Sequence, residues 1–159
     1  MDAFWRDDDI ESRRRLSCVP YPSRWTTFAD AFDLSWSAIP FRRGGGSTLP
    51  AEAGFYCFFV GQARPQLPLI LFPLYAGETG NLRQRYGQYV REKDSRKGRY
   101  HVRRFLKAFA GEAAFAFALF DGEEQARKAI EKQLNNALMP PYSQNDYTAD
   151  VGARKRAWQ

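Results

Sequence analysis

Residues 54–60 read GFYCFFV, and this stretch decides how the rest of the chain is organised. It is rich in aromatic and other β-favouring side chains and ends at Gly61, so it predicts a strand. A second strand is predicted over residues 69–76, after a loop over residues 62–68. Because Pro73 has no amide hydrogen to donate to a neighbouring strand, the second strand is expected at an edge of the sheet.

Downstream of these strands, helical and strand patterns alternate. Asn81 and Gln84 have the spacing of a capping box and open a helix that reaches about Lys93. The remaining predicted elements are a helix over 101–110, a strand over 114–120 and a helix over 123–138. This order predicts an α+β fold, in which helices flank a small three-stranded antiparallel sheet.

Upstream of these strands the sequence is less regular. Residues 1–49 are interpreted as an N-terminal extension of unclear role, the compact domain is expected over residues 50–146, and residues 147–159 form a basic C-terminal tail. Within the extension we expect helices over 11–16 and 23–32 and a flexible glycine-rich loop over 42–47.

Composition limits the class of protein. The chain has 159 residues and a net charge of +6, which fits one domain and weakly favours an anionic partner. One histidine and two separated cysteines, Cys18 and Cys57, cannot build the usual zinc site. The N-terminus is acidic where a secretory signal would be basic, and the longest apolar run, residues 67–76, is too short to cross a bilayer. We therefore expect a cytoplasmic protein with no membrane partner.

Two tyrosines and an arginine are the first candidates for chemistry. Tyr56 and Tyr75 each have a glycine two residues away, where a ligand or a neighbouring backbone can approach closely. Arg85 and Tyr89 are four residues apart on one face of the next predicted helix. An arginine in this position can bind a phosphate and stabilise charge that develops during reaction.

Together these residues resemble the signature of the GIY-YIG nucleases. Residues 54–56 read GFY, and residues 75–85 read YAGETGNLRQR, with Arg85 where the family has its catalytic arginine. Tyr89 is similar to the tyrosine at that place in the nuclease domain of the bacterial excision-repair incision subunit. In the last helix, Glu131 is similar to the glutamate that holds the family's divalent cation. The resemblance covers about residues 49–146.

The resemblance implies a metal-dependent endonuclease that hydrolyses phosphodiester bonds in DNA. Tyr56, its pKa lowered by the positive field of the site, would act as general base, and Tyr75 would position the water or the phosphate. Arg85 would neutralise the phosphate, with Tyr89 beside it. Glu131 would bind one Mg²⁺ or Mn²⁺, with water completing the coordination shell.

The sequence departs from the family pattern in two places. Tyr56 and Tyr75 lie 19 residues apart, which is more than usual for the family, and the loop over 62–68 can absorb the difference. The family has an asparagine directly after the proline–tyrosine element near the C-terminus, whereas this chain has Ser143 there and Asn145 two residues later, and either could fill that supporting role. Asn145 is carried forward as a candidate nucleic-acid contact.

Substrate binding is predicted from a basic segment. Residues 91–107 contain eight Lys or Arg and two acids, a net charge of +6 that equals the net charge of the whole chain. Such a segment beside an active site would bind phosphates in a salt-dependent way. Its candidate contacts are Lys97, Arg99, His101, Arg103, Arg104 and Lys107.

Three alternatives to this reading remain open. The enzyme could cut RNA or single-stranded nucleic acid, as a toxin or defence protein would. The same site could belong to a sequence-specific restriction enzyme. The same fold could also be a catalytically inactive module that only binds nucleic acid, although such a module would not need both tyrosines, Arg85 and Glu131.

Overall fold

The computed structural model describes residues 14, 22–62, 70–95, 97–143 and 153. Its elements are α2 (Pro22–Ala31), β1 (Trp36–Pro40), the 3₁₀ helix η1 (Gly45–Thr48), β2 (Gly54–Gln62), β3 (Ile70–Thr79), α3 (Leu82–Asp94), α4 (Tyr100–Ala108), β4 (Ala114–Leu119) and α5 (Glu124–Leu138). Every helix and strand predicted between residues 23 and 138 is therefore confirmed, with its ends displaced by a few residues at most.

The sheet has four antiparallel strands in the order β1-β4-β2-β3, so the prediction of three strands is wrong. The unforeseen strand is β1, which lies in the segment interpreted as an N-terminal extension and pairs with β4. It is five residues long, ends at Pro40 and has no buried residue, so its sequence carries little strand signal. The edge position expected for the strand that contains Pro73 is confirmed, since β3 ends the sheet.

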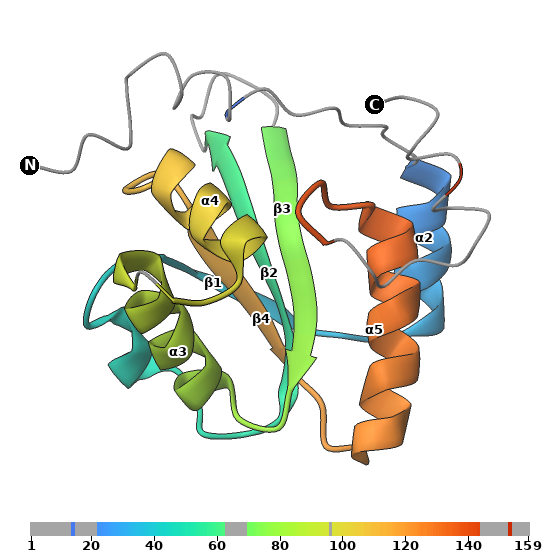
Figure 1. Cartoon of the computed structure of the whole chain (residues 1–159). Coiled ribbons are helices and arrows are strands. Elements are labelled where there is room, and N and C mark those ends of the chain that lie inside the picture. Colours follow the sequence, from blue (N-terminus) through green and yellow to red (C-terminus); the bar gives the residue numbers. More distant parts are fainter. Residues whose placement is uncertain (1–13, 15–21, 63–69, 96, 144–152, 154–159) are drawn as a thin grey trace, which may run out of the picture.

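Helices cover both faces of the sheet, which gives three layers (Figure 1). Alternation along β2 divides the core: Tyr56 and Phe58 pack with α3 and α4, whereas Phe55 and Cys57 pack with α2 and α5. The stripe predicted for the helix over 101–110 is buried as expected, with Val102, Phe105, Leu106 and Phe109 all in the core beneath α4.

The segment after α5 covers the free edge of β3. Met139 ends α5 in the left-handed conformation, with φ of 45°, and Pro140 and Pro141 follow it. Two hydrogen bonds join this segment to the open side of the strand, from Tyr142 N–H to Leu74 O (3.0 Å) and from Ala76 N–H to Ser143 Oγ (3.3 Å). A third comes from α5 itself, where Glu131 Oε1 accepts the Glu78 N–H (3.1 Å). An edge strand covered in this way is protected from pairing with other chains.

The glycine-rich loop forms a turn that contains η1 and packs on α3. Gly45 and Gly46 lie on the ring of Tyr86, where an added methyl group would be 2.5 Å and 2.9 Å from ring or hydroxyl atoms. The Tyr86 hydroxyl accepts a hydrogen bond from the Arg42 N–H at 2.9 Å and lies 2.9 Å from the Arg42 carbonyl. Glycine is therefore required here by close packing on α3.

Some predictions concern residues outside the described ranges. The helix over 11–16 lies outside them apart from Arg14, as do the loop beyond Gln62 and the C-terminal tail apart from Ala153. In the described part of the chain, no helix combines the length and the apolar character needed to cross a membrane.

Candidate active site

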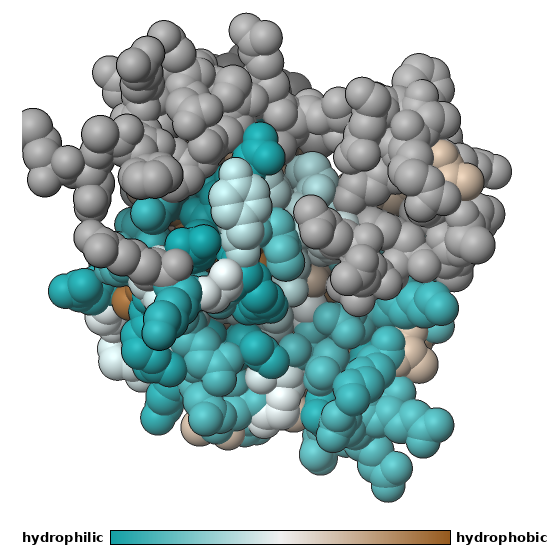
Figure 2. All heavy atoms as spheres, viewed as in Figure 1, coloured by the Kyte–Doolittle hydropathy of each residue, from teal (hydrophilic) through white to brown (hydrophobic). Residues whose placement is uncertain are grey.

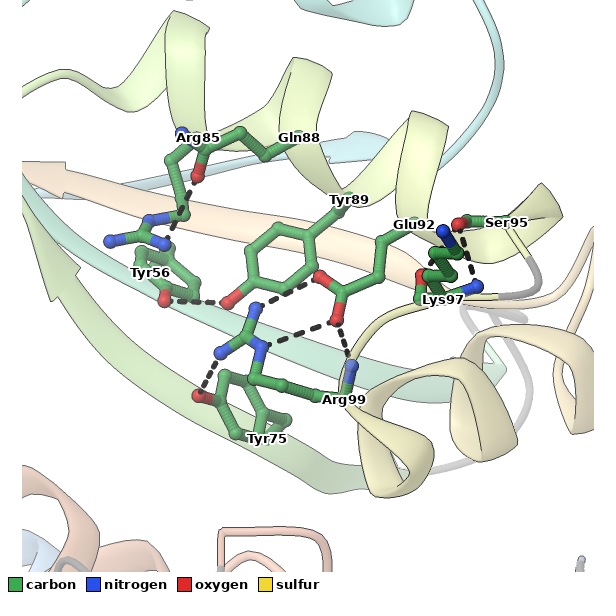
Figure 3. Close-up of polar contacts among 9 residues, drawn as sticks. All are labelled: Tyr56, Tyr75, Arg85, Gln88, Tyr89, Glu92, Ser95, Lys97 and Arg99. Atoms are coloured by element: carbon green, nitrogen blue, oxygen red, sulfur yellow. Dashed lines mark hydrogen bonds and ion pairs between the residues drawn. The ribbon is translucent and has the colours of Figure 1, made fainter.

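The tyrosines singled out from the sequence meet between the sheet and α3. The hydroxyl oxygens of Tyr56 and Tyr89 are 2.7 Å apart, and the rings of Tyr56 and Tyr75 lie side by side with centroids 6.4 Å apart (Figure 3). Gly77 faces Tyr56 across the β2–β3 pair, and a methyl group at Gly77 would lie 2.4 Å from the Tyr56 hydroxyl oxygen. The glycine after the second tyrosine therefore makes room for the first.

Local sequence explains how α3 presents its side chains to this cluster. Asn81 caps the helix by accepting the Gln84 N–H at 2.9 Å, as the capping spacing predicted. The reciprocal position, the Asn81 N–H, is occupied by Thr79 Oγ1 at 3.1 Å. The helix therefore starts at a fixed place beside the end of β3, which directs Arg85 and Tyr89 toward the sheet.

Burial controls the acidity of these phenols. Tyr56 is 3% exposed, and burial, followed by the neighbouring phenols of Tyr89 and Tyr75, raises its pKa well above the usual value, while Arg85 lowers it. Burial likewise raises the pKa of Tyr89. The prediction that the pKa of Tyr56 is lowered is therefore wrong for the protein without metal or substrate. The increase in pKa caused by desolvation is larger than the decrease caused by the charge of Arg85.

Arg85 lies close to Tyr56 and is only partly satisfied. Its Nη1 donates to Gln88 Oε1 at 3.1 Å, on the next turn of α3 (Figure 3). Its Nε is buried and has no hydrogen-bond partner among the described residues. A buried guanidinium nitrogen without a partner is costly, and an anion bound beside it would relieve that cost.

Arg99 contacts two of the three tyrosines, Tyr75 and Tyr89. Its Nη1 donates to the Tyr75 hydroxyl at 3.3 Å, and its guanidinium lies 5.4 Å from the centroid of the Tyr89 ring. Glu92, near the end of α3, holds the same guanidinium through an ion pair of 3.0 Å. Glu92 was not among the candidates from the sequence, although it lies three residues after Tyr89 on the face that carries Arg85.

Glu131 reaches the site from the opposite layer. It projects from α5 and accepts the Glu78 N–H, the peptide group that follows Gly77. The carboxylate therefore binds the same short stretch of β3 that faces Tyr56. Glu78 itself is held by Arg127 through an ion pair of 2.9 Å that is largely buried, and Arg127 also donates to the Gly122 carbonyl at 2.7 Å. Arg127 was missed because a single arginine in an exposed-looking helix has no distinctive sequence signal.

The predicted nucleic-acid contacts lie on α4 and the turn before it, in a region whose surface is largely hydrophilic (Figure 2). Lys97 is exposed, the His101 ring lies 6.3 Å from that of Tyr75, and Arg103 Nη1 donates to the Ser95 carbonyl at 3.2 Å. Arg104 and Lys107 are half-buried on α4. Asn145 lies outside the described residues, and Ser143 instead binds the edge of β3.

The donor set limits the kind of metal that the site could hold. Among the described residues, no three His, Cys, Asp or Glu side chains gather into a group that could enclose an ion. The single Glu131 carboxylate fits a cation that keeps most of its water shell, as Mg²⁺ does, and does not fit a dehydrated zinc site.

Comparison with known proteins finds no match. Neither a scan of protein-family models nor searches of curated proteins and of solved structures give a significant counterpart for the chain. The resemblance to GIY-YIG nucleases therefore rests on the motif residues of the sequence.

Proposed function

We propose that the protein is a metal-dependent endonuclease of the GIY-YIG type that hydrolyses phosphodiester bonds in DNA. One observation carries the proposal: residues from β2, β3 and α3 converge in a tyrosine–arginine cluster, and the Glu131 carboxylate binds β3 at the strand position next to it. Neither packing nor edge protection requires a buried pair of tyrosine hydroxyls beside an arginine with an unpaired nitrogen.

The chain's own groups supply most of the chemistry in this proposal. Arg85 binds the nonbridging phosphate oxygens, which provides a partner for its buried Nε. Tyr56, in its phenolate form, accepts the proton of the attacking water and becomes the neutral phenol. Before this step Tyr89 donates a hydrogen bond to the Tyr56 phenolate across the 2.7 Å contact. Tyr75 orients the water or the phosphate through its hydroxyl, which Arg99 holds.

Glu131 would hold the metal ion, with the Glu78 N–H fixing the orientation of the carboxylate. When bound, Mg²⁺ or Mn²⁺ would stabilise negative charge on the leaving oxygen. The positive charge of an ion and the guanidinium of Arg85 both favour the phenolate form of Tyr56, in opposition to desolvation.

The raised pKa of Tyr56 gives this function a definite pH dependence. The reactive form is the phenolate, a minor species at neutral pH, and burial reduces its population further by raising the pKa of Tyr56. The single-turnover cleavage rate should therefore increase with pH through the neutral and mildly alkaline range. Tyr56→Phe should remove both the cleavage and its alkaline increase.

The deciding experiment measures nicking of supercoiled plasmid with Mg²⁺, with Mn²⁺ and with a chelator. Wild type is compared with Glu131→Gln and with Glu124→Gln, an exposed glutamate on the same helix. We expect metal-dependent nicking by wild type and by Glu124→Gln, and a loss on the order of 10²-fold or more in Glu131→Gln.

Two outcomes would count against the proposal. If folded wild type cuts neither duplex DNA, single-stranded DNA nor RNA with either metal, the protein is not a nuclease, and retained binding would indicate a nucleic-acid-binding module. If Glu131→Gln cuts as fast as wild type, Glu131 is not the metal ligand. Cleavage of RNA or single-stranded DNA alone would correct the substrate and leave the chemistry unchanged.

A further inference from the structure

Arg99 was predicted to bind the phosphate backbone of nucleic acid, but in the structure its guanidinium is hydrogen-bonded to residues of the candidate site. Three hydrogen bonds join it to Glu92: from the backbone N–H to Oε1 at 2.9 Å, from Nε to Oε1 at 3.2 Å and from Nη2 to Oε2 at 3.0 Å. Its remaining nitrogen, Nη1, donates to the Tyr75 hydroxyl at 3.3 Å. Each of the three guanidinium nitrogens thus donates at least one hydrogen bond within the site.

Burial of Glu92 and the turn at Gly98 both stabilise the pair of Glu92 and Arg99. Glu92 is the more buried partner, with 13% of its side chain exposed against 40% for Arg99. Gly98, with φ of +138°, brings the turn against Glu92, where an added methyl group would lie 3.2 Å from its Cγ. Both this backbone conformation and this close approach favour glycine at the residue before Arg99. An arginine that only binds DNA in solution would need none of these arrangements.

We propose that Arg99, fixed by Glu92, is a positioning residue that holds the Tyr75 hydroxyl and the Tyr89 ring in the reactive arrangement. This inference rests on the proposed nuclease function and assigns to the site a second arginine and a second glutamate. Arg99 acts through the tyrosines: it restrains one phenol by a hydrogen bond and covers the face of another ring by a cation–π contact.

The sign of the Glu92 effect separates positioning from phosphate binding. Glu92→Gln removes a negative charge, so it should leave DNA binding unchanged or tighten it. If Arg99 only binds phosphate, loss of its carboxylate partner releases it for DNA, and cleavage does not fall. If Arg99 positions the tyrosines, loss of the partner loosens them, and cleavage falls although DNA binds at least as well.

The experiment measures DNA affinity and the single-turnover rate at saturating protein for Glu92→Gln, Arg99→Gln, Arg99→Lys and the double variant. The matched control is the exposed pair of Arg43 and Asp94, 3.3 Å apart, in which Asp94→Asn makes the same charge change on the same helix. We expect rates reduced on the order of 10- to 100-fold by Glu92→Gln and Arg99→Gln, and an unchanged rate in Asp94→Asn. Arg99→Lys, which loses the planar fork, should fall between Arg99→Gln and wild type.

Non-additivity and salt dependence complete this set of measurements. The double variant should lose no more rate than Arg99→Gln alone, because both changes break one unit. The salt dependence of DNA binding should be the same in Arg99→Gln and wild type, whereas a lost phosphate contact would reduce its slope by about 0.9. A reduced slope with an unchanged rate would overturn the proposal.

A second readout does not depend on cleavage. In protein with isotopically labelled tyrosine rings, the Tyr75 signal, assigned with Tyr75→Phe, should move in Arg99→Gln and Glu92→Gln and stay in place in Asp94→Asn. If wild type fails to cut any nucleic acid while the Tyr75 signal moves as expected, the nuclease function fails and the positioning contact stands. If the signal does not move, the positioning role is overturned whatever the cleavage result.

Discussion

Arg127→Met tests the buried ion pair between Arg127 and Glu78, the β3 residue whose N–H donates to Glu131. Arg127 lies on α5 and pairs with Glu78 on β3 at 2.9 Å, with side-chain exposures of 11% and 14%. It also donates to the Gly122 carbonyl at 2.7 Å, so it joins the β4–α5 turn to the sheet. Methionine has a similar length and keeps the apolar contacts of the stem while it removes the charge and the donors.

The expected cost follows from these contacts. Removing one partner of a buried ion pair leaves an uncompensated charge, at a cost of about 3–5 kcal/mol. Both side chains retain some exposure, so the lower end of that range applies, and about 3 kcal/mol is expected. For a chain of this size, roughly 2–4 °C of melting temperature is lost per kcal/mol, which gives a decrease of about 6–12 °C.

The assay is thermal unfolding together with urea unfolding of wild type, Arg127→Met and the double variant Arg127→Met/Glu78→Gln. The double variant removes the unpaired carboxylate as well and should recover about 1–2 kcal/mol. Lys128→Met is the matched control: Lys128 is the next residue on α5 and forms an exposed pair with Glu124, with side-chain exposures of 60% and 66%. That control should have the melting temperature of wild type.

The reasoning would be refuted by an Arg127→Met protein whose melting temperature lies within about 2 °C of wild type. It would be refuted equally by a double variant that is less stable than Arg127→Met, because the unpaired carboxylate would then not be the source of the cost. A decrease of equal size in Lys128→Met would mean that methionine on this helix, and not the buried pair, is responsible.

Three further perturbations test other parts of the fold. Gly77→Ala should displace the Tyr56 hydroxyl, 2.4 Å from the added methyl group, and cost about 1–3 kcal/mol by urea unfolding, whereas Gly80→Ala, with its nearest neighbour at 3.7 Å, should be tolerated. Tyr86→Phe should cost about 1–3 kcal/mol in the same assay, because the glycine-rich turn loses a buried hydrogen-bond partner. Burial raises the pKa of Cys57 from 9.0 to about 12. Above pH 9 the thiol therefore loses its proton in the unfolded chain while it keeps it in the folded protein. The free energy of unfolding should fall by roughly 1.4 kcal/mol per pH unit until the pH reaches the pKa of the folded protein. Cys57→Ala should lack this component, measured as the difference in unfolding free energy between neutral pH and pH about 10.

Much of the fold could be predicted because its main signals are local. Each of these signals is contained in a short stretch of sequence. The confirmed ones are the two aromatic strands, the cap at Asn81 and the apolar stripe of α4. The placement of Pro73 in an edge strand followed from one missing amide hydrogen. Such features depend on residues that are close together in the sequence, so a pattern over a short stretch is enough to predict them.

The errors involve contacts between distant parts of the chain. β1 is a strand only because β4, more than 70 residues later, offers it an edge, with Trp36 opposite Ala118. The glycine-rich turn packs closely on the Tyr86 ring, which no local rule for glycine can predict. The pKa of Tyr56 depends on how completely neighbouring elements exclude water, so charge counting from the sequence gave the wrong direction.

Glu131 serves both the fold and the proposed chemistry, and the two roles can be separated. As part of the edge cover of β3 it accepts the Glu78 N–H, which the amide oxygen of glutamine would accept equally well. As a metal ligand it must carry a negative charge, which glutamine lacks. Glu131→Gln should therefore keep the unfolding free energy of wild type and lose metal-dependent cleavage, whereas Glu131→Ala should lose about 1 kcal/mol of stability as well. If Glu131→Gln is as unstable as Glu131→Ala, the charge serves the fold, and loss of cleavage in either variant no longer identifies a metal ligand.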